Sequence, residues 1–307
     1  MYYNSLNENL KARFGQKIYK LTLDCGMTCP NRDGTLGTRG CIFCSGGSGA
    51  FAARGKTVAE QIEAAKARVS GKIKNGKYIA YFQSYTNTYA DVGYLRKIFT
   101  QAAEPPDIAA LSVATRPDCL EEEKTELLAE LSKIKPVTVE LGLQTVHEQT
   151  ARYIRRGYPL PVFDDAVKRL RRAGLETVAH VILFLPGESE QMMLKTVRHA
   201  ADCGIDGIKL QLLHVLSGTD LEKDYAAGKF SLPSMEQYIQ TLKKCIRILP
   251  PNVVIHRLTG DGAKRELVAP LWSADKKRVL NAINAEFKRD NVIQGSDYIQ
   301  NSHDFFV

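Results

Sequence analysis

Cysteines in one glycine-rich stretch are the residues of this chain best suited to chemistry. Cys29 begins the run Cys-Pro-Asn-Arg-Asp-Gly, and Cys41 and Cys44 follow Gly40 with two residues between them. Cys25 precedes Cys29 by four positions, so four of the seven cysteines fall within twenty residues. Thiolates are soft ligands, and several in one loop favour a metal ion or an iron–sulfur cluster.

The cysteine spacing leaves two kinds of site open. A structural zinc site takes four protein ligands, which the pairs Cys25/Cys29 and Cys41/Cys44 could supply, although the first pair is wider than usual. A cluster with one open iron takes three thiolates and a small organic ligand. Disulfides are a poor explanation, because we expect a cytoplasmic protein whose thiols stay reduced.

Composition indicates a soluble protein with a large core. The chain has 307 residues, of which 44% are hydrophobic. Its first residues are polar, and no apolar run approaches the roughly 20 residues of a membrane span. We therefore expect a cytoplasmic location and no membrane partner. Lys and Arg outnumber Asp and Glu by 42 to 34, a net charge of +8 that suits nucleic acid or is simply a basic surface.

Apolar strands alternate with amphipathic helices along the chain. Strands are predicted at residues 17–23, 78–82, 108–114, 137–143, 177–185, 207–213 and 253–257. Helices are predicted at residues 57–70, 92–103, 120–132, 147–155, 162–173, 190–203, 234–249 and 274–289. Capping boxes at Thr57 and Ser234 mark two of the helix starts.

This alternation predicts an α/β fold with a parallel sheet of about six core strands. A partial or full TIM-like (β/α) barrel suits the spacing, with a doubly wound open sheet as the alternative. We expect residues 1–230 to form the barrel core, with a cluster loop at 25–49. Residues 231–307 are expected to be a C-terminal extension packed on the barrel.

Polar residues follow the predicted strands on the edge where parallel α/β proteins place their sites. The cysteines come after the first strand, Gln83 after the second and Gln144 at the end of the fourth. Because the carboxyl ends of parallel strands meet at one edge, these groups should converge with the thiolates.

The cysteine run resembles that of the radical S-adenosylmethionine superfamily, in which an aromatic residue precedes the last cysteine. The long insert between Cys29 and the pair Cys41/Cys44 is similar to the Elp3-like branch, and Cys-Pro-Asn-Arg-Asp-Gly to its YhcC/YtqA-type, MnmL-like proteins. The resemblance continues through the segments at 81–83, 114–118, 140–145, 207–209 and 256–257.

The resemblance implies two cofactors, a 4Fe–4S cluster and S-adenosylmethionine. It assigns the cluster to Cys29, Cys41 and Cys44 and leaves Cys25 as a non-ligand. The fourth iron would bind S-adenosylmethionine, whose reductive cleavage gives a 5′-deoxyadenosyl radical. An electron donor such as flavodoxin or ferredoxin is then a partner.

The same resemblance suggests four residues that contact S-adenosylmethionine: Gln83, Gln144, Arg156 and His180. An arginine suits the methionine carboxylate because its guanidinium is always charged. Gln83 could instead cap a loop, and His180 could be a buried structural histidine. We assign no catalytic residue.

Other residues carry weaker indications. Glu140 stands in an apolar strand and needs a partner if it is buried, in the barrel interior or in a structural ion pair. Lys209 could face the substrate. Aromatic residues at 81, 82, 85 and 89 could stack an RNA base, although such residues are more often core. The remaining cysteines, Cys119, Cys203 and Cys245, are read as ordinary buried thiols.

The substrate implied by the resemblance is a wobble uridine of tRNA. The reaction would convert 5-carboxymethylaminomethyluridine to 5-aminomethyluridine. The alternatives are a radical enzyme acting on another RNA or a small metabolite, and a zinc-stabilised RNA-binding protein without catalysis.

Overall fold

The computed structural model describes residues 2–24, 26–46, 52, 55, 57–72, 76–260, 262 and 264–299. Its main feature is a seven-stranded sheet in the order β1-β2-β3-β4-β5-β6-β8, and every neighbouring pair is parallel. The strands are β1 (Ile18–Leu23), β2 (Lys77–Phe82), β3 (Ile108–Thr115), β4 (Val137–Gln144), β5 (Glu176–Leu183), β6 (Gly207–Leu212) and β8 (Val254–Arg257).

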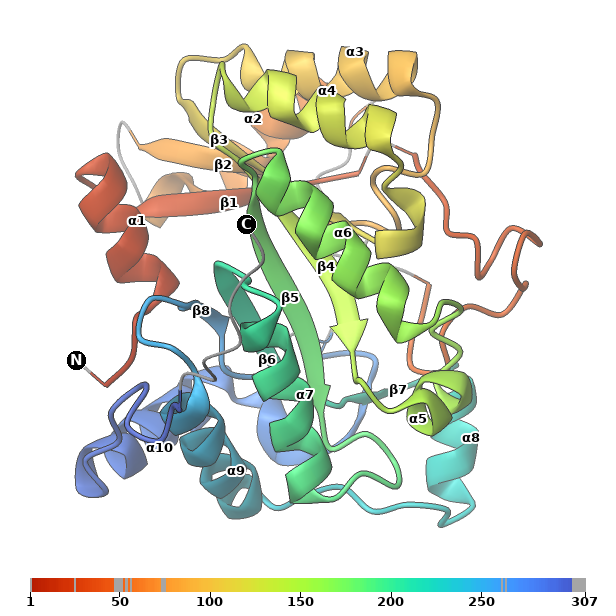
Figure 1. The fold of residues 1–307 in the computed structure, drawn as a ribbon, viewed down its shortest axis with the longest axis vertical. Helices are drawn as coiled ribbons and strands as arrows, with labels where there is room; N and C mark the ends of the chain where they lie inside the picture. The colour runs from red at the N-terminus through yellow and green to blue at the C-terminus, as the bar shows by residue number, and fades with distance from the viewer. Residues whose placement is uncertain are drawn as a thin grey trace.

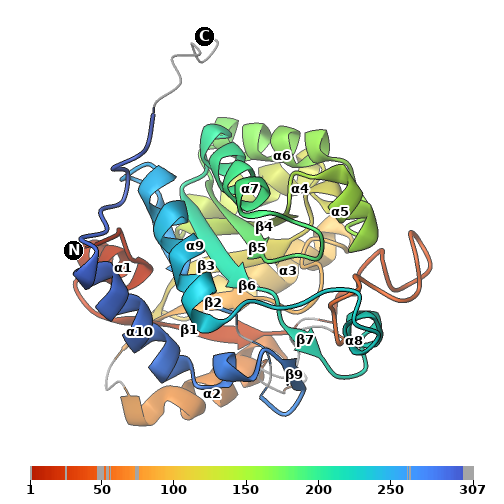
Figure 2. The same cartoon turned by 90° about the horizontal axis from the view of Figure 1, so that it is seen from below.

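Helices cover the outer face of the curved sheet (Figures 1 and 2). The helices of the described chain are α1 (Leu6–Phe14), α2 (Val58–Val69), α3 (Val92–Ala103), α4 (Glu122–Ser132), α5 (Glu148–Tyr153), α6 (Leu160–Arg172), α7 (Glu190–Asp202), α8 (Asp220–Ala226), α9 (Met235–Ile248) and α10 (Lys276–Arg289), and not all of them lie on that face. Short 3-10 turns lie at Ser70–Lys72, Pro117–Cys119 and Leu271–Ala274. A small antiparallel sheet joins β7 (Val215–Leu216) to β9 (Leu267–Ala269).

The prediction of a partial parallel barrel is confirmed. All seven predicted strands lie in one sheet, and within the described chain the two end strands, β1 and β8, do not pair with each other. The predicted capping boxes at Thr57 and Ser234 are both present. In each, the side chain of the first residue and that of the third helical residue satisfy backbone N–H groups that the helix leaves unpaired.

The N-terminal segment covers the open side of the barrel. The Ile255 N–H of β8 donates to the Asn4 carbonyl over 2.7 Å, and Ser5 forms a parallel bridge with Ile255. Helix α1 then packs against both β1 and β8. Sequence patterning did not predict α1, because the helix buries a single side chain, Leu10.

The C-terminal part contributes to the barrel itself. Strand β8 pairs with β6 in the main sheet, so the chain after residue 231 supplies the last strand as well as outer helices. The proposed division between residues 230 and 231 stays a prediction. No helix within the described ranges is long and apolar enough to cross a membrane.

Candidate active site

One cavity of about 370 Å³ lies where the strands of the parallel sheet end. The structure brings all seven predicted site residues to its lining, although they come from five different segments of the chain. They are Cys29, Cys41, Cys44, Gln83, Gln144, Arg156 and His180. Their shared position follows from the parallel sheet, because the carboxyl ends of its strands and the loops that follow them gather on one edge. The roles of the individual residues stay predictions.

The cysteine loop after β1 is held against the segment after α5. The Asn31 side-chain amide donates to the Cys41 sulfur over 3.3 Å and to the Arg155 carbonyl over 2.7 Å. The Ile42 N–H donates to the Ile154 carbonyl over 3.1 Å. Figures 1 and 2 show this loop, α5 and α8 on one side of the molecule. The middle thiol is thus fixed by backbone and amide contacts.

Gly40 permits a close approach within the same loop. The Arg32 guanidinium donates to the Cys44 carbonyl over 2.5 Å. An added Cβ at Gly40 would lie 2.8 Å from that guanidinium, and the Gly40 φ is +73°. Because a side chain here is both strained and crowded, glycine at position 40 lets Arg32 fix the last cysteine.

The three thiols suit a group larger than a single ion. Cys29, Cys41 and Cys44 are free and half-buried. Among the described residues, their sulfurs do not form a set lying within 4.8 Å of one another. A tetrahedral zinc ion with bonds of about 2.3 Å holds its sulfurs about 3.8 Å apart. The wider spacing and the soft donors fit an iron–sulfur cluster. Cys25 lies outside the described residues.

Gln144 has an unsatisfied acceptor at the cavity. It ends β4 with a φ of +64°, at a break in the register between β4 and β5. Its buried Oε1 has no hydrogen-bond partner within the described chain. An unpaired buried amide oxygen is costly, so a ligand N–H is the natural partner for it. This is the feature that best fits a polar cofactor such as S-adenosylmethionine.

Arg156 is anchored by the protein. Its Nη1 donates to the carbonyls of Leu143 and Thr145 over 3.3 and 2.6 Å, its Nε to the Tyr158 carbonyl over 2.9 Å, and its Nη2 to the Glu148 carboxylate over 2.9 Å. These bonds use four of the five guanidinium N–H groups. Carboxylate binding by Arg156 would therefore use the remaining Nη2 hydrogen.

The inner end of the cavity is built around the fully buried carboxylate of Glu140. Glu140 accepts hydrogen bonds from five side chains, each of which stands on a different strand: β1, β2, β3, β5 and β6. They are Lys20 at 2.7 Å, Tyr81, Ser112 and His180 at 2.8 Å each, and Lys209 in a short contact. Both meanings suggested for Glu140 hold, because it lies in the barrel interior and forms ion pairs.

Burial and charge set the protonation of this network. Burial alone would raise the pKa of Glu140, but Lys20 and Lys209 hold it well below its usual range. Burial lowers the pKa of Lys209 to about 7, against the attraction of Glu140. Burial and the Lys209 charge lower the pKa of His180 to about 4. His180 is therefore neutral near pH 7 and donates its Nε2 hydrogen to Glu140.

The structure confirms some of the weaker predictions made from the sequence and contradicts others. Phe82 is fully buried in the core and cannot stack an RNA base, whereas Tyr85 lines the cavity. Cys119 and Cys245 are buried thiols as predicted. Cys203 is only half-buried, so that prediction was wrong for it. Lys20 was not predicted from the sequence, where its signal was a cation within an apolar strand.

Comparison with known proteins assigns the family. Residues 34–200 match the Radical SAM superfamily, and residues 205–289 match the Radical_SAM C-terminal domain. The chain belongs to the radical SAM superfamily. The first match contains Cys41 and Cys44 and begins after Cys29. The resemblance seen in the cysteine loop is thereby confirmed at the level of the family.

Three similar proteins support the Elp3-like branch of radical SAM proteins. YtqA of Bacillus subtilis is 43% identical over 95% of this chain and 92% of its own. The tRNA uridine(34) acetyltransferase of Methanocaldococcus jannaschii is 28% identical over 50% of this chain and 28% of its own. The structure of Methanocaldococcus infernus Elp3, 17% identical, covers 90% of this chain and 64% of that chain with a TM-score of 0.70, which shows a common fold.

This protein is therefore a radical SAM enzyme, and its family implies a 4Fe–4S cluster and S-adenosylmethionine as cofactors. When bound, they supply a 5′-deoxyadenosyl radical through reductive cleavage of S-adenosylmethionine. The cavity meets the demands of both cofactors, with spread thiols at one end and the unsatisfied Gln144 oxygen beside them.

Proposed function

We propose that this radical SAM enzyme modifies the wobble uridine of tRNA, converting 5-carboxymethylaminomethyluridine to 5-aminomethyluridine. Cys29, Cys41 and Cys44 would hold the cluster. The similarity to a tRNA uridine(34) acetyltransferase over half of the chain supports a tRNA substrate. The net charge of +8 suits the phosphates of RNA. A reductant of the flavodoxin or ferredoxin class would supply the electron.

The observation that carries this proposal is the charge of the inner cavity wall. Lys209 and Arg257 both line the cavity, where Glu140 is the facing carboxylate and His180 is neutral. Lys20 and Lys209 each form an ion pair with Glu140. The two lysines thus meet the single carboxylate of Glu140, and with a pKa of about 7 Lys209 can take up a proton when an anion binds beside it. Two lysines beside one carboxylate suit a substrate group that carries a carboxylate of its own, as the carboxymethyl group does.

The remaining contacts divide the cavity between cofactor and substrate. Gln83, Gln144, Arg156 and His180 are the side chains we assign to S-adenosylmethionine. Gln144 would accept a ligand N–H, and Arg156 would donate its remaining Nη2 hydrogen to a carboxylate. The neutral His180, held by Glu140, would present Nδ1 as an acceptor to a hydroxyl. Lys209 lies beside His180, where the substrate carboxylate could approach both groups.

The test is a reaction of the purified enzyme, with its cluster reconstituted anaerobically, on tRNA that carries 5-carboxymethylaminomethyluridine. S-adenosylmethionine and dithionite are added, and the nucleosides are quantified by mass spectrometry. We expect 5-aminomethyluridine to form with the enzyme and not with Cys41→Ala. Unchanged tRNA, in a reaction where S-adenosylmethionine is still cleaved, would contradict the assigned substrate and point to another RNA or a small metabolite.

A further inference from the structure

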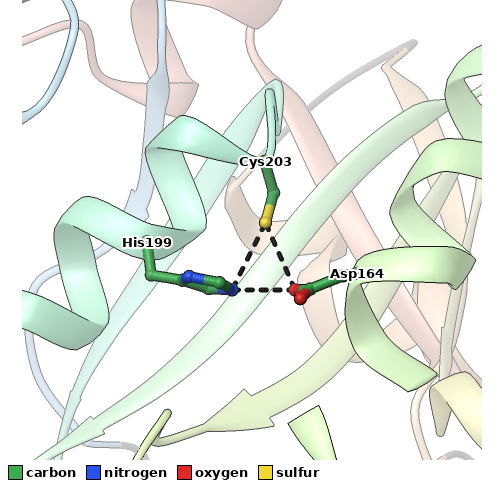
Figure 3. A group of neighbouring side chains, drawn as sticks. All are labelled: Asp164, His199 and Cys203. Carbon is green, nitrogen blue, oxygen red and sulfur yellow. Dashed lines mark hydrogen bonds and ion pairs between the residues drawn. The ribbon is translucent and has the colours of Figure 1, made fainter. Parts of the chain in front are cut away.

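A second group of ligand-type side chains lies outside the cavity. Figure 3 shows Asp164 of α6 pointing toward His199 and Cys203, which stand one helical turn apart at the end of α7. None of the three lines the cavity. The His199 Nε2 lies 2.7 Å from the Asp164 Oδ1, and the Cys203 sulfur lies 3.4 Å from that oxygen and 3.5 Å from that nitrogen.

The arrangement differs from that of a cysteine nucleophile with its base. A catalytic triad uses both ring nitrogens of histidine, one toward the nucleophile and the other toward the carboxylate. Here the same nitrogen, Nε2 of His199, faces both Asp164 and Cys203. This geometry therefore does not support a proton relay through the His199 imidazole ring. Three donor atoms instead converge on one point, and such convergence is characteristic of ion coordination.

We propose that Asp164, His199 and Cys203 bind a divalent transition-metal ion of the zinc class. Thiolate, imidazole and carboxylate are the three ligand types that zinc takes in proteins. In a tetrahedral site with bonds of about 2.0 Å to nitrogen and oxygen and about 2.3 Å to sulfur, the donors lie roughly 3.3 to 3.5 Å apart. Both sulfur separations already match, and the histidine–aspartate pair, now 2.7 Å apart, needs to open by about 0.6 Å.

The site is also accessible to an ion. All three residues are half-buried, so metal and a fourth ligand such as water can enter from solvent. Without an ion, burial and the Asp164 carboxylate raise the pKa of the Cys203 thiol, and a bound cation reverses this by favouring the thiolate. Because the ligands come from α6 and α7, the ion would cross-link these two outer helices.

The test uses the enzyme with its cluster assembled, so that Cys29, Cys41 and Cys44 are occupied. Zinc is added in competition with a chelator of known affinity, and zinc and iron are counted for each chain. We expect one zinc in addition to the iron. Because loss of a supporting hydrogen bond already weakens metal binding about 10- to 100-fold, Cys203→Ser and Asp164→Asn should each weaken it by more than about 100-fold.

Asp165→Asn is the matched control, because it removes the same charge from the adjacent, exposed position of α6. It should bind zinc like the wild type. Diffraction at the zinc absorption edge should place the anomalous peak among the three side chains. Equal zinc affinity in Cys203→Ser and wild type, or no zinc retained by folded wild-type enzyme at micromolar free metal, would overturn the proposal.

Discussion

At the scale of single residues, Glu140 decides whether the barrel interior holds together. It is fully buried and bonded to five side chains, two of them lysines. A buried charge pair adds little to stability compared with an apolar pair, yet removing one partner strands the other charge in a poorly solvated site. Removing one charged side chain of this network should therefore lower the stability of the fold strongly. Removing a carboxylate together with one of its lysines should lower it less.

We predict that Glu140→Gln lowers the free energy of unfolding by about 3–5 kcal/mol, because Lys20 and Lys209 lose their counter-charge. Urea unfolding of the cluster-free protein measures it. The double variant Glu140→Gln/Lys209→Met should recover part of the loss, since one of the stranded cations is also removed. A double variant as unstable as the sum of both single variants would show that the two groups do not interact.

The residues of the cavity could be predicted from the sequence to different degrees. Position after a strand was enough to place Gln83 and Gln144 at the site, because parallel strands end on one edge. Sequence could not reveal that protein carbonyls occupy most of the Arg156 donors, since Leu143 and Thr145 reach it only through the turn after β4. The partners of Glu140 were hidden for the same reason, as they come from five other strands.

At the scale of elements, the cysteine loop gets its shape from short contacts rather than from regular structure. Gly40 with its positive φ brings Arg32 to the Cys44 carbonyl, and Asn31 ties Cys41 to the segment after α5. The loop is thus held at two points, close to two of its thiols. Changes at these points should affect metal loading before they affect the fold of the barrel.

We predict that Gly40→Ala reduces the iron retained after reconstitution. Alanine at this φ costs roughly 1–2 kcal/mol, and its Cβ would displace Arg32 from the last cysteine. Iron and protein assays of the desalted enzyme measure the effect. Gly37→Ala is the control in the same loop, since its added Cβ would meet an ordinary contact at 3.5 Å. Equal iron loss in both variants would argue against a special role for Gly40.

The elements themselves were largely predictable, because apolar runs of strand length and capped amphipathic helices follow local rules. The exceptions were short or weakly amphipathic pieces, such as α1, α8 and the β7–β9 pair. Their stability comes from contacts distant in the chain. Asn4 pairs with the edge of β8, some 250 residues later, and no local pattern records this pairing.

At the scale of the whole molecule, two half-buried histidines should make the fold sensitive to acid. The pKa of His180 is lowered to about 4 and that of His256 well below its usual value, mainly by burial. The unfolded chain then binds protons near pH 6.5 that the folded chain does not. The stability that these two neutral histidines contribute is therefore fully present above about pH 6.5 and is lost as the pH falls toward 4.

We predict that the free energy of unfolding of the cluster-free protein falls between pH 7 and pH 5, by roughly 2 kcal/mol for His180 and further for His256. Urea titrations at the two pH values measure the change. His180→Asn should reduce the difference, because one of the protons is no longer taken up on unfolding. A stability that is the same at both pH values would mean that the histidines are not held neutral in the fold.

The charge of the whole chain bears on its partner. If tRNA is bound through its phosphates, affinity should fall steeply with salt, because each neutralised phosphate releases a counterion. We predict at least about a tenfold loss of tRNA affinity between 50 mM and 200 mM salt. Filter binding or fluorescence titration of the cluster-loaded enzyme would show it, and an affinity indifferent to salt would contradict an electrostatic contact with RNA.

The most direct test of the account measures iron and S-adenosylmethionine cleavage in enzyme purified without oxygen, alongside Cys29→Ala and Cys25→Ala. We predict about four irons in each wild-type chain and cleavage on reduction, both lost in Cys29→Ala and kept in Cys25→Ala. This result would make Cys29 a cluster ligand and exclude Cys25, as ligation by Cys29, Cys41 and Cys44 requires. Colourless wild-type protein that carries zinc on these cysteines, or iron loss in both variants, would contradict three-thiolate ligation.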